Sequence, residues 1–186
     1  MTKELPIAID IIKKGGILLY PTDTVYGLGC DACDEKAIER IAKLKNRPSN
    51  KSYIILVNSI EDLKDLLVDY KEEWFAKIPN DKPTTIIYPK TKNLPKAVLA
   101  EDGSVAIRII NHPFCTALLK GIKTPLISTS ANISGEPSPS AFTDISASIL
   151  QGVDYVVNLP AARDRVSEPS RIIKIAQDGE FITLRD

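Results

Sequence analysis

In the stretch Ile17-Leu18-Leu19-Tyr20-Pro21-Thr22-Asp23-Thr24-Val25-Tyr26-Gly27-Leu28-Gly29, an apolar run passes directly into a segment rich in hydroxyls and glycines. Four consecutive apolar residues, 17–20, predict a short strand that is buried on both faces. Gly15 and Gly16 lie immediately before this strand and end a preceding helical pattern. The stretch therefore predicts an α/β unit with a polar, ligand-sized loop at the end of a buried strand.

Outward from this stretch, strand and helix patterns interleave along the chain. Further strands are predicted over residues 53–57, 84–88, 105–109, 125–128, 155–158, 171–175 and 181–184. Helices are predicted over residues 5–14, 34–45, 60–68, 71–78, 112–119 and 141–150. Because several strands follow one another near the end, we expect an α/β fold with a twisted, mixed β-sheet and packed helices, and not a pure doubly wound parallel sheet.

Length and composition favour one domain spanning residues 1–186, with no repeats or low-complexity linkers. The 24 basic residues are balanced by 24 acidic ones, and this neutral net charge argues against a dedicated nucleic-acid binder. A neutral net charge still allows a local basic patch. The charged N-terminus predicts no signal peptide, and no apolar run is long enough for a membrane span. We therefore expect a cytoplasmic protein.

Cysteine and histidine are too scarce to support most metal or redox chemistry. Cys30 and Cys33 form a C-x-x-C pair, but only Cys115 and His112 remain as further zinc ligands. A redox pair would need a helix N-terminus directly after a strand, which this position resembles only loosely. We therefore expect that the protein itself holds no metal and that Cys30 and Cys33 are small residues packed near the ligand site. Zinc binding and redox chemistry stay as alternatives. His112 lies before Pro113, a position that suits the start of a helix.

Two familiar nucleotide motifs are excluded by context. The run from Gly27 to Ala32 matches a dinucleotide fingerprint superficially, yet six residues separate it from the preceding strand and no acidic residue follows at the required distance. The chain has no P-loop lysine and no G-x-S-x-G elbow.

What remains is a site of fixed cations, hydroxyls and amides. Lys45 and Arg47 lie where a predicted helix ends, and Ser130 and Asn132 follow a predicted strand. Such groups suit phosphates and carboxylates, although cations at a helix C-terminus also simply complement the helix dipole. Arg108 lies inside an apolar strand, where a charge needs a partner such as a ligand carboxylate, unless its side chain alternates outward to solvent.

Four segments together resemble the signature blocks of the YrdC family, in the family's order and spacing and across nearly the whole chain. These segments are Pro21 to Ala32, Lys45-Asn46-Arg47-Pro48, Val105-Ala106-Ile107-Arg108, and Ser128 to Gly135. The resemblance implies the YrdC-like fold with an open concave ligand cleft, in its short, single-domain form. It also implies L-threonylcarbamoyladenylate synthase activity: L-threonine, bicarbonate and ATP, with Mg²⁺, give threonylcarbamoyl-AMP and pyrophosphate, and partner proteins transfer the threonylcarbamoyl group to tRNA.

The resemblance further implies roles for individual residues. Lys45, Arg47, Ser130 and Asn132 match a tetrad around the phosphates and the reacting centre. Threonine binding is expected at Thr24, Arg108, Ser130 and Ser170. Nucleotide binding is expected at Arg47, Lys51, Ser104, Asn132, Ser140 and Arg185.

The chain departs from the family pattern at two places. Arg171 follows Ser170 where the family usually has threonine, and Leu56 stands where some members carry a substrate-contacting histidine. These departures keep open a paralogue that uses the same cleft for a different carbamoyl or acyl substrate. A non-catalytic RNA-binding module is a second alternative, although clustered basic and aromatic residues are missing. The sequence leaves the oligomeric state, the order of substrate binding and direct RNA binding open.

Overall fold

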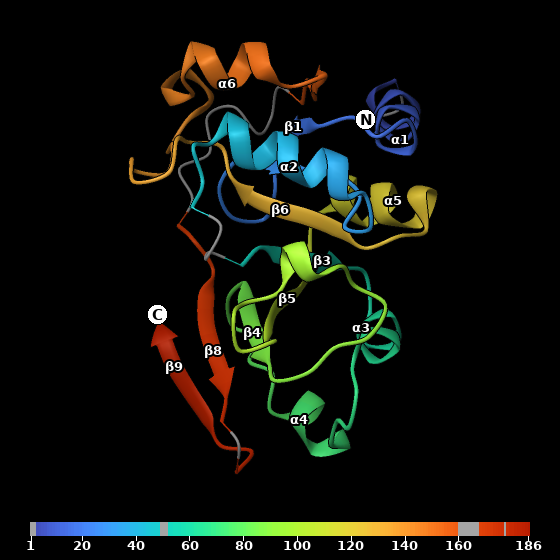
Figure 1. Cartoon of the computed structure of the whole chain (residues 1–186), viewed down its shortest axis with the longest axis vertical. Coiled ribbons are helices and arrows are strands. Elements are labelled where there is room, and N and C mark those ends of the chain that lie inside the picture. The colour runs from blue at the N-terminus through green and yellow to red at the C-terminus, as the bar shows by residue number, and fades with distance from the viewer. Residues whose placement is uncertain (1–2, 49–51, 160–167, 177) are drawn as a thin grey trace.

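The computed structural model describes residues 3–48, 52–159, 168–176 and 178–186. Its strands form one sheet in the order β7-β1-β2-β6-β3-β5-β4-β8-β9 (Figure 1). The strands are β1 (Leu18–Tyr20), β2 (Gly27–Gly29), β3 (Ile54–Val57), β4 (Thr84–Tyr88), β5 (Val105–Ile109), β6 (Leu126–Ser130), β7 (Tyr155–Val156), β8 (Arg171–Ile175) and β9 (Phe181–Arg185). Three neighbouring pairs, β1/β7, β3/β5 and β4/β8, are parallel and the others antiparallel, which confirms the mixed sheet.

Helices pack on this sheet and leave part of one face open. They are α1 (Glu4–Lys13), α2 (Glu35–Leu44), α3 (Ile60–Leu66), α4 (Glu72–Ala76), α5 (Pro113–Ile122) and α6 (Ala147–Gly152), with 3₁₀ turns η1 (Lys96–Val98) and η2 (Phe142–Asp144). Helices α1 and α5 share one apolar cluster with β1 and β6, whereas α2, α3 and α4 contribute to another. Figure 1 shows β8 and β9 as a long hairpin at one end of the molecule, with the C-terminus beside it.

Alternation along the central strands separates the core from the open face. Ile86, Ile107 and Ile173 belong to the largest apolar cluster, which α2, α3 and α4 help to form. Their neighbours Ile87 and Arg108 line a cavity on the other side of the sheet. Because successive strand residues point to opposite faces, one sheet provides both the hydrophobic core and the floor of a ligand site.

Strand β2 was not predicted, because its Gly27-Leu28-Gly29 sequence carries almost no apolar pattern. Glycine is required here by close contact: a Cβ on Gly29 would lie 2.5 Å from the carbonyl oxygen of Ile127 and 2.8 Å from the ring of Tyr20. These glycines therefore lie in an antiparallel strand between β1 and β6, and not in a phosphate-binding turn before a helix.

The prediction of one helix over residues 141–150 was wrong. The Asp144 carboxylate accepts the backbone N–H groups of Ser140 and Ala141, at 3.1 and 2.9 Å, and closes the separate turn η2. Ile145 is extended, and α6 begins only after Ser146. The helical spacing was misleading because Ile145 and Ile149 are both buried, although Ile145 lies in the extended link between η2 and α6 and only Ile149 lies in the helix. In the described part of the chain, no helix combines the length and apolar character that a membrane crossing requires.

Candidate functional site

The end of helix α2 aims two cations in different directions. Asn46 adopts a left-handed conformation with φ of 48°, and the N–H of Arg47 bonds the carbonyl of Ala42 at 2.9 Å. With the bond from Asn46 N–H to the Lys43 carbonyl, at 3.1 Å, this is a Schellman C-cap. The turn therefore separates Lys45, which points into the protein, from Arg47, which lines the cavity.

Lys45 fastens helix α2 to the segment 85 residues later. Its side chain is only 1% exposed, and its ammonium donates to the backbone carbonyls of Ser130 and Asn132. In return, the N–H of Ser134 donates to the Lys45 carbonyl at 2.7 Å. Burial, and then the positive charge of Arg47, lower the pKa of Lys45 to about 8. The predicted proximity of the two segments is therefore observed, with Lys45 directly behind the cavity wall.

Ser130 and Asn132 form a small hydrogen-bonded unit at the end of β6. The Ser130 hydroxyl donates to the Asn132 side-chain oxygen, and the Asn132 amide donates to the carbonyls of Ile133 and Glu136, at 3.0 and 2.6 Å. Ser130 lines the cavity, whereas Asn132 is not among the lining residues. The loop that follows β6 is therefore fixed from inside by Asn132.

Arg47 is held flat against an aromatic ring. Its guanidinium carbon lies 4.5 Å from the centre of the Tyr53 ring, and Nη2 donates to the carbonyl of Ser52. Burial lowers the pKa of Arg47, although the group stays protonated at any ordinary pH. A stacked, partly desolvated guanidinium beside a cavity is suited to an anionic ligand.

Arg108 is buried and turns toward the cavity, which excludes the solvent-facing alternative. Its side chain is 4% exposed, and Nη1 donates to the hydroxyl of Thr24 at 3.0 Å. Nη2 lies 3.3 Å from Oδ1 of Asp23. The Thr22 hydroxyl, 2.9 Å from that of Thr24, extends the same network. Residues of the predicted polar loop thus supply partners to a cation 84 positions later.

The opposite wall comes from the last two strands. Ser170 is buried, its hydroxyl lies 2.8 Å from that of Thr85, and its carbonyl accepts from Arg185 at 3.0 and 2.6 Å. Burial, and then the charge of Arg108, lower the pKa of Arg185. Ser170 and Arg185 both line the cavity, so residues from the end of the chain face those from its beginning.

Together these elements enclose a cavity of about 280 Å³, hereafter the cleft. Among the described residues, its lining includes the arginines Arg47, Arg108 and Arg185 and no Asp or Glu. Hydroxyls complete the polar surface, from Thr22, Thr24, Tyr26, Ser52, Ser128, Thr129, Ser130, Ser138 and Ser170. A positive, hydroxyl-rich cleft of this kind can bind phosphates and carboxylates and can stabilise negative charge that develops during a reaction.

Not every predicted site residue lines the cleft. Ser104 is buried, and its hydroxyl and N–H both bond the Asp102 carboxylate, so it stabilises its own loop here. Ser140 is exposed, and Lys51 lies outside the described residues. The nucleotide roles of all three stay predictions.

Sequence reasoning missed Asp23 and Ser138. Asp23 is the acidic partner of Arg108, and the only signal for it was an acid placed between two threonines of the polar loop. Ser138 lines the cleft from the loop between β6 and η2, where it lies between Pro137 and Pro139. Lone serines in such loops carry no spacing pattern.

Metal and redox roles for the cysteines gain no support from the described residues. Cys30 and Cys115 are buried free thiols, and burial raises the pKa of both. Among the residues the structure describes, no group of three His, Cys, Asp or Glu side chains could hold a metal ion.

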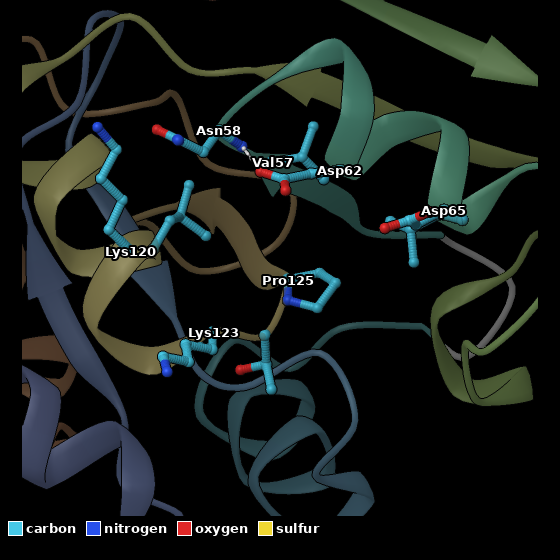
Figure 2. A pocket seen from close by; sticks show the side chains of 10 residues that line it. Val57, Asn58, Asp62, Asp65, Lys120, Lys123 and Pro125 are labelled. Atoms are coloured by element: carbon cyan, nitrogen blue, oxygen red, sulfur yellow. Dashed lines mark hydrogen bonds between the residues drawn. The ribbon is translucent and has the colours of Figure 1, made fainter.

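A second hollow, of about 370 Å³, differs in character (Figure 2). Asp62 and Asp65 of α3 and Lys120 and Lys123 near the end of α5 line it, and the Asn58 N–H donates to Asp62 at 3.1 Å. None of the predicted site residues lies there. Its mixed charge does not select for phosphates, so the arginine-lined cleft is the better candidate.

Comparison with known proteins gives concordant matches. The model of the Sua5/YciO/YrdC family, described as "Telomere recombination", matches residues 10–186. A threonylcarbamoyl-AMP synthase of Pseudoalteromonas translucida (strain TAC 125) is 33% identical over 183 residues, covering 93% of each chain.

Among solved structures, P. abyssi Sua5 complexed with L-threonine superimposes with a TM-score of 0.83 at 30% identity. That match covers 97% of this chain but only 53% of the P. abyssi chain, so the chain spans about half of that protein. E. coli YciO superimposes with a TM-score of 0.81 at 23% identity, and the match covers 100% of this chain and 92% of the YciO chain. At this identity the likeness supports the fold alone.

Proposed function

The chain belongs to the Sua5/YciO/YrdC family, and on that premise we propose that it is an L-threonylcarbamoyladenylate synthase. The reaction converts L-threonine, bicarbonate and ATP into threonylcarbamoyl-AMP and pyrophosphate. The observation that carries the proposal is the cleft that Arg47, Arg108 and Arg185 line, with no carboxylate among its described lining residues. The substrates of this reaction are all anions or carry a carboxylate, which such a cleft can bind. Curated relatives over nearly the full length carry the name of this enzyme, of nucleotidyltransferase type.

In the proposed complex, Arg108 and Thr24 bind the threonine carboxylate. Their contact already positions the guanidinium and the hydroxyl side by side on the cleft floor. The carboxylate would share the Arg108 charge with Asp23, which keeps the guanidinium oriented when the cleft is empty of substrate. Ser170, on the opposite wall, completes the amino-acid site together with Ser130.

The chemistry requires positioning and charge stabilisation, and no side-chain nucleophile. The threonine amine adds to bicarbonate and releases water, giving a carbamate. A carbamate oxygen then attacks the α-phosphorus of ATP in line, and pyrophosphate leaves with the electron pair of the broken P–O bond. Arg47 and Arg185 offset the negative charge of the phosphates from the cleft surface, and the Lys45 ammonium adds its positive charge from behind the cleft wall.

Magnesium enters this proposal as part of the substrate Mg·ATP. Mg²⁺ in phosphoryl-transfer sites is usually held by one or two carboxylates plus the substrate phosphates. Since the described residues of the cleft lining offer hydroxyls but no carboxylate, the phosphates would supply most of the anionic ligands.

The decisive experiment follows label from radiolabelled bicarbonate into a nucleotide product, with ATP, Mg²⁺ and L-threonine. We expect threonine-dependent label and stoichiometric pyrophosphate, and no product with L-serine at the same concentration. Nucleotide binding without this product would contradict the proposal and favour a paralogue that uses another carbamoyl or acyl substrate.

Transfer of the product to tRNA by partner proteins, and a cytoplasmic location, belong to the same proposal. A competing role as an RNA-binding module predicts a salt-sensitive complex with bare tRNA that ATP does not affect. Gel shifts with and without Mg·ATP distinguish the two.

A further inference from the structure

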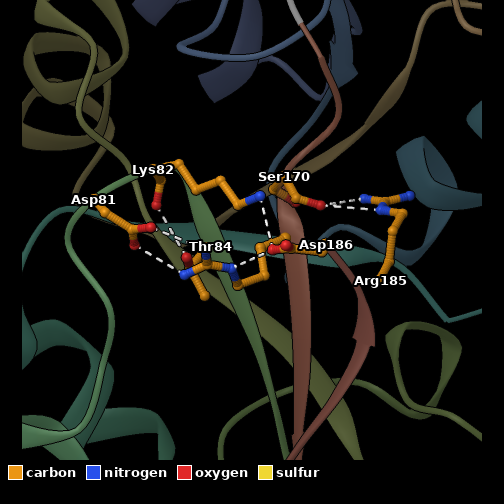
Figure 3. A network of polar contacts seen from close by, with 7 residues as sticks. Asp81, Lys82, Thr84, Ser170, Arg185 and Asp186 are labelled. Carbon is orange, nitrogen blue, oxygen red and sulfur yellow. Dashed lines mark hydrogen bonds and ion pairs between the residues drawn. The ribbon is translucent and has the colours of Figure 1, made fainter.

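Two sets of side-chain contacts join the start of β8 to the end of β9 beside the cleft (Figure 3). On the cleft side, Arg185 donates from Nε and Nη2 to the carbonyl of Ser170, at 3.0 and 2.6 Å. Arg171 and Asp186, which follow Ser170 and Arg185 in the chain, make a second contact. In it, Nε of Arg171 donates to Oδ1 of Asp186 at 2.7 Å. Ser170 and Arg185 line the cleft, whereas Arg171 and Asp186 do not. The second contact therefore lies behind the first.

Arg171 is the centre of this second contact. Its Nη1 and Nη2 bind both oxygens of Asp81, at 2.8 and 2.9 Å, in a two-pronged ion pair. Lys82 adds a contact to Asp186 at 2.7 Å. The Arg171 side chain is 16% exposed, against 61% for Asp81 and 70% for Asp186, so the guanidinium fills the middle of the cluster. The carboxylates stay ionised at ordinary pH, because Lys82 and Arg171 lower the pKa of Asp186 to about 2.

The backbone alone holds Arg185 poorly. Strand β9 is at the edge of the sheet and is exposed from Ile182 onward. Its pairing with β8 shifts register between Ile172 and Ile173, just where Ile172 faces Arg185. A register shift interrupts the ladder of hydrogen bonds locally, so side-chain contacts must fix the direction of Arg185.

We propose that Arg171 is a positioning residue for Arg185, acting through Asp186 and anchored on Asp81. This inference rests on the proposed function, since it takes Mg·ATP as the ligand of Arg185. Arg171 is also the residue at which the chain departs from the threonine usual in the YrdC pattern. Arg171 does not itself line the cleft, and it adds an ion-pair cluster behind the cleft wall.

This ion-pair cluster acts on the two substrates unequally. Ser170 has a second, independent hold, the 2.8 Å contact of its hydroxyl with Thr85. Within the part of the chain that the structure describes, the Arg185 guanidinium hydrogen-bonds the Ser170 carbonyl and has no comparable second partner. Loss of Arg171 should therefore weaken Mg·ATP binding and leave L-threonine binding nearly unchanged.

The test is calorimetric titration of Arg171→Gln with Mg·ATP and, separately, with L-threonine. We expect the Kd for Mg·ATP to rise about tenfold and that for L-threonine to change less than about twofold. Arg171→Lys keeps the positive charge but loses the planar guanidinium that contacts two carboxylates. Its Kd for Mg·ATP should lie between those of the wild type and Arg171→Gln. Asp186→Asn should match Arg171→Gln in its effect on Mg·ATP binding, and the double variant should add nothing, since the ion pair between Arg171 and Asp186 is lost in each.

Arg40→Gln is the matched control. Arg40 makes an equally close ion pair, in which its Nη2 contacts both carboxylate oxygens of Asp154 at 2.8 and 2.9 Å, and neither residue lines the cleft. We expect both affinities of this variant to equal those of the wild type. Thermal unfolding of all variants checks that each is folded, and exposed ion pairs should change it little.

Each outcome separates the two proposals. Wild-type protein that binds no Mg·ATP would overturn the proposed function and this inference with it. Wild-type binding of Mg·ATP, with Arg171→Gln binding it equally well, would overturn the inference alone. Equal loss of affinity for both ligands would assign Arg171 a general structural role and would also overturn it.

Discussion

Nη1 of Arg108 lies 3.0 Å from the hydroxyl oxygen of Thr24, and its Nη2 lies 3.3 Å from the carboxylate of Asp23. The buried arginine of β5 thus contacts two consecutive residues of the loop after β1. One contact is to a neutral group that a ligand can share, and the other is to a charge that balances the guanidinium. This arrangement lets one residue serve both stability and substrate binding.

Removal of Arg108 should therefore have two separable effects. In Arg108→Ala, the Asp23 carboxylate loses its ion-pair partner in a nearly buried position, and we expect a stability loss of about 3 kcal/mol. The KM for threonine should rise at least about tenfold, because a charged hydrogen-bond donor to its carboxylate is lost. Urea unfolding and initial rates measure the two effects.

Arg108→Ala combined with Asp23→Asn is the control for that variant. Neutralising Asp23 should restore part of the stability without restoring threonine binding. An unchanged KM for threonine in Arg108→Ala would contradict the assignment of the carboxylate site.

Lys45 should be essential for catalysis. In Lys45→Ala we expect a loss of about 2.7–4 kcal/mol of transition-state stabilisation, by comparison with removal of oxyanion donors. Lys43→Ala is the matched control, since Lys43 is on the same helix, is exposed and pairs only with Glu39 at 2.8 Å. Adenylate formation by Lys45→Ala at the wild-type rate would disprove this role.

The pH dependence of the reaction should also report Lys45. Because the pKa of Lys45 is lowered to about 8, its ammonium loses its proton as pH rises through that value. We expect kcat/KM for ATP to fall above pH 8, since this parameter follows the free enzyme. Lys45→Arg, which does not titrate in this range, should abolish that fall even if its rate is low.

Through Lys45, a rise in pH should lower the rate but increase the stability of the folded protein. The folded protein holds the Lys45 pKa below its ordinary value of 10.5, so the unfolded chain binds more protons between about pH 8 and 10.5. The contribution of Lys45 to stability should therefore rise as pH rises through this window, by up to about 3 kcal/mol. Chemical unfolding of wild type and Lys45→Met at several pH values isolates it; a parallel pH response of the two would contradict the shift.

Gly29→Ala should destabilise the sheet. The added methyl group would lie 2.5 Å from the Ile127 carbonyl, and backbone cannot move aside cheaply, so we expect a loss of about 1–3 kcal/mol. Gly121→Ala is the contrasting variant, because the atoms nearest to its methyl group belong to the Ile9 side chain, Cδ1 at 2.2 Å and Cγ1 at 2.8 Å, and a side chain can move where backbone cannot. Equal thermal stability of Gly29→Ala and wild type would contradict the close packing of β1, β2 and β6.

The sequence by itself determined most of the element pattern and the chemical character of the site. Runs such as residues 17–20 predict strands because burial on both faces requires consecutive apolar residues, a purely local signal. The segments at Lys45 and Ser130 were recognisable because cations and small polar side chains at element ends suit an anionic ligand. Their resemblance to the YrdC family then identified them as parts of one site.

Only the tertiary structure decided which of these residues lie on the cleft surface and which support it. Strand β2 escaped prediction because its glycines are defined by what approaches them, Tyr20 and Ile127, and not by a pattern of their own. Lys45 was expected at the phosphates, yet its ammonium is occupied by backbone carbonyls. Asp23 and Arg171 gained their roles from partners 85 and 15 residues away. Contacts between distant segments depend on how the sheet brings strands together, and no local pattern of residues encodes that.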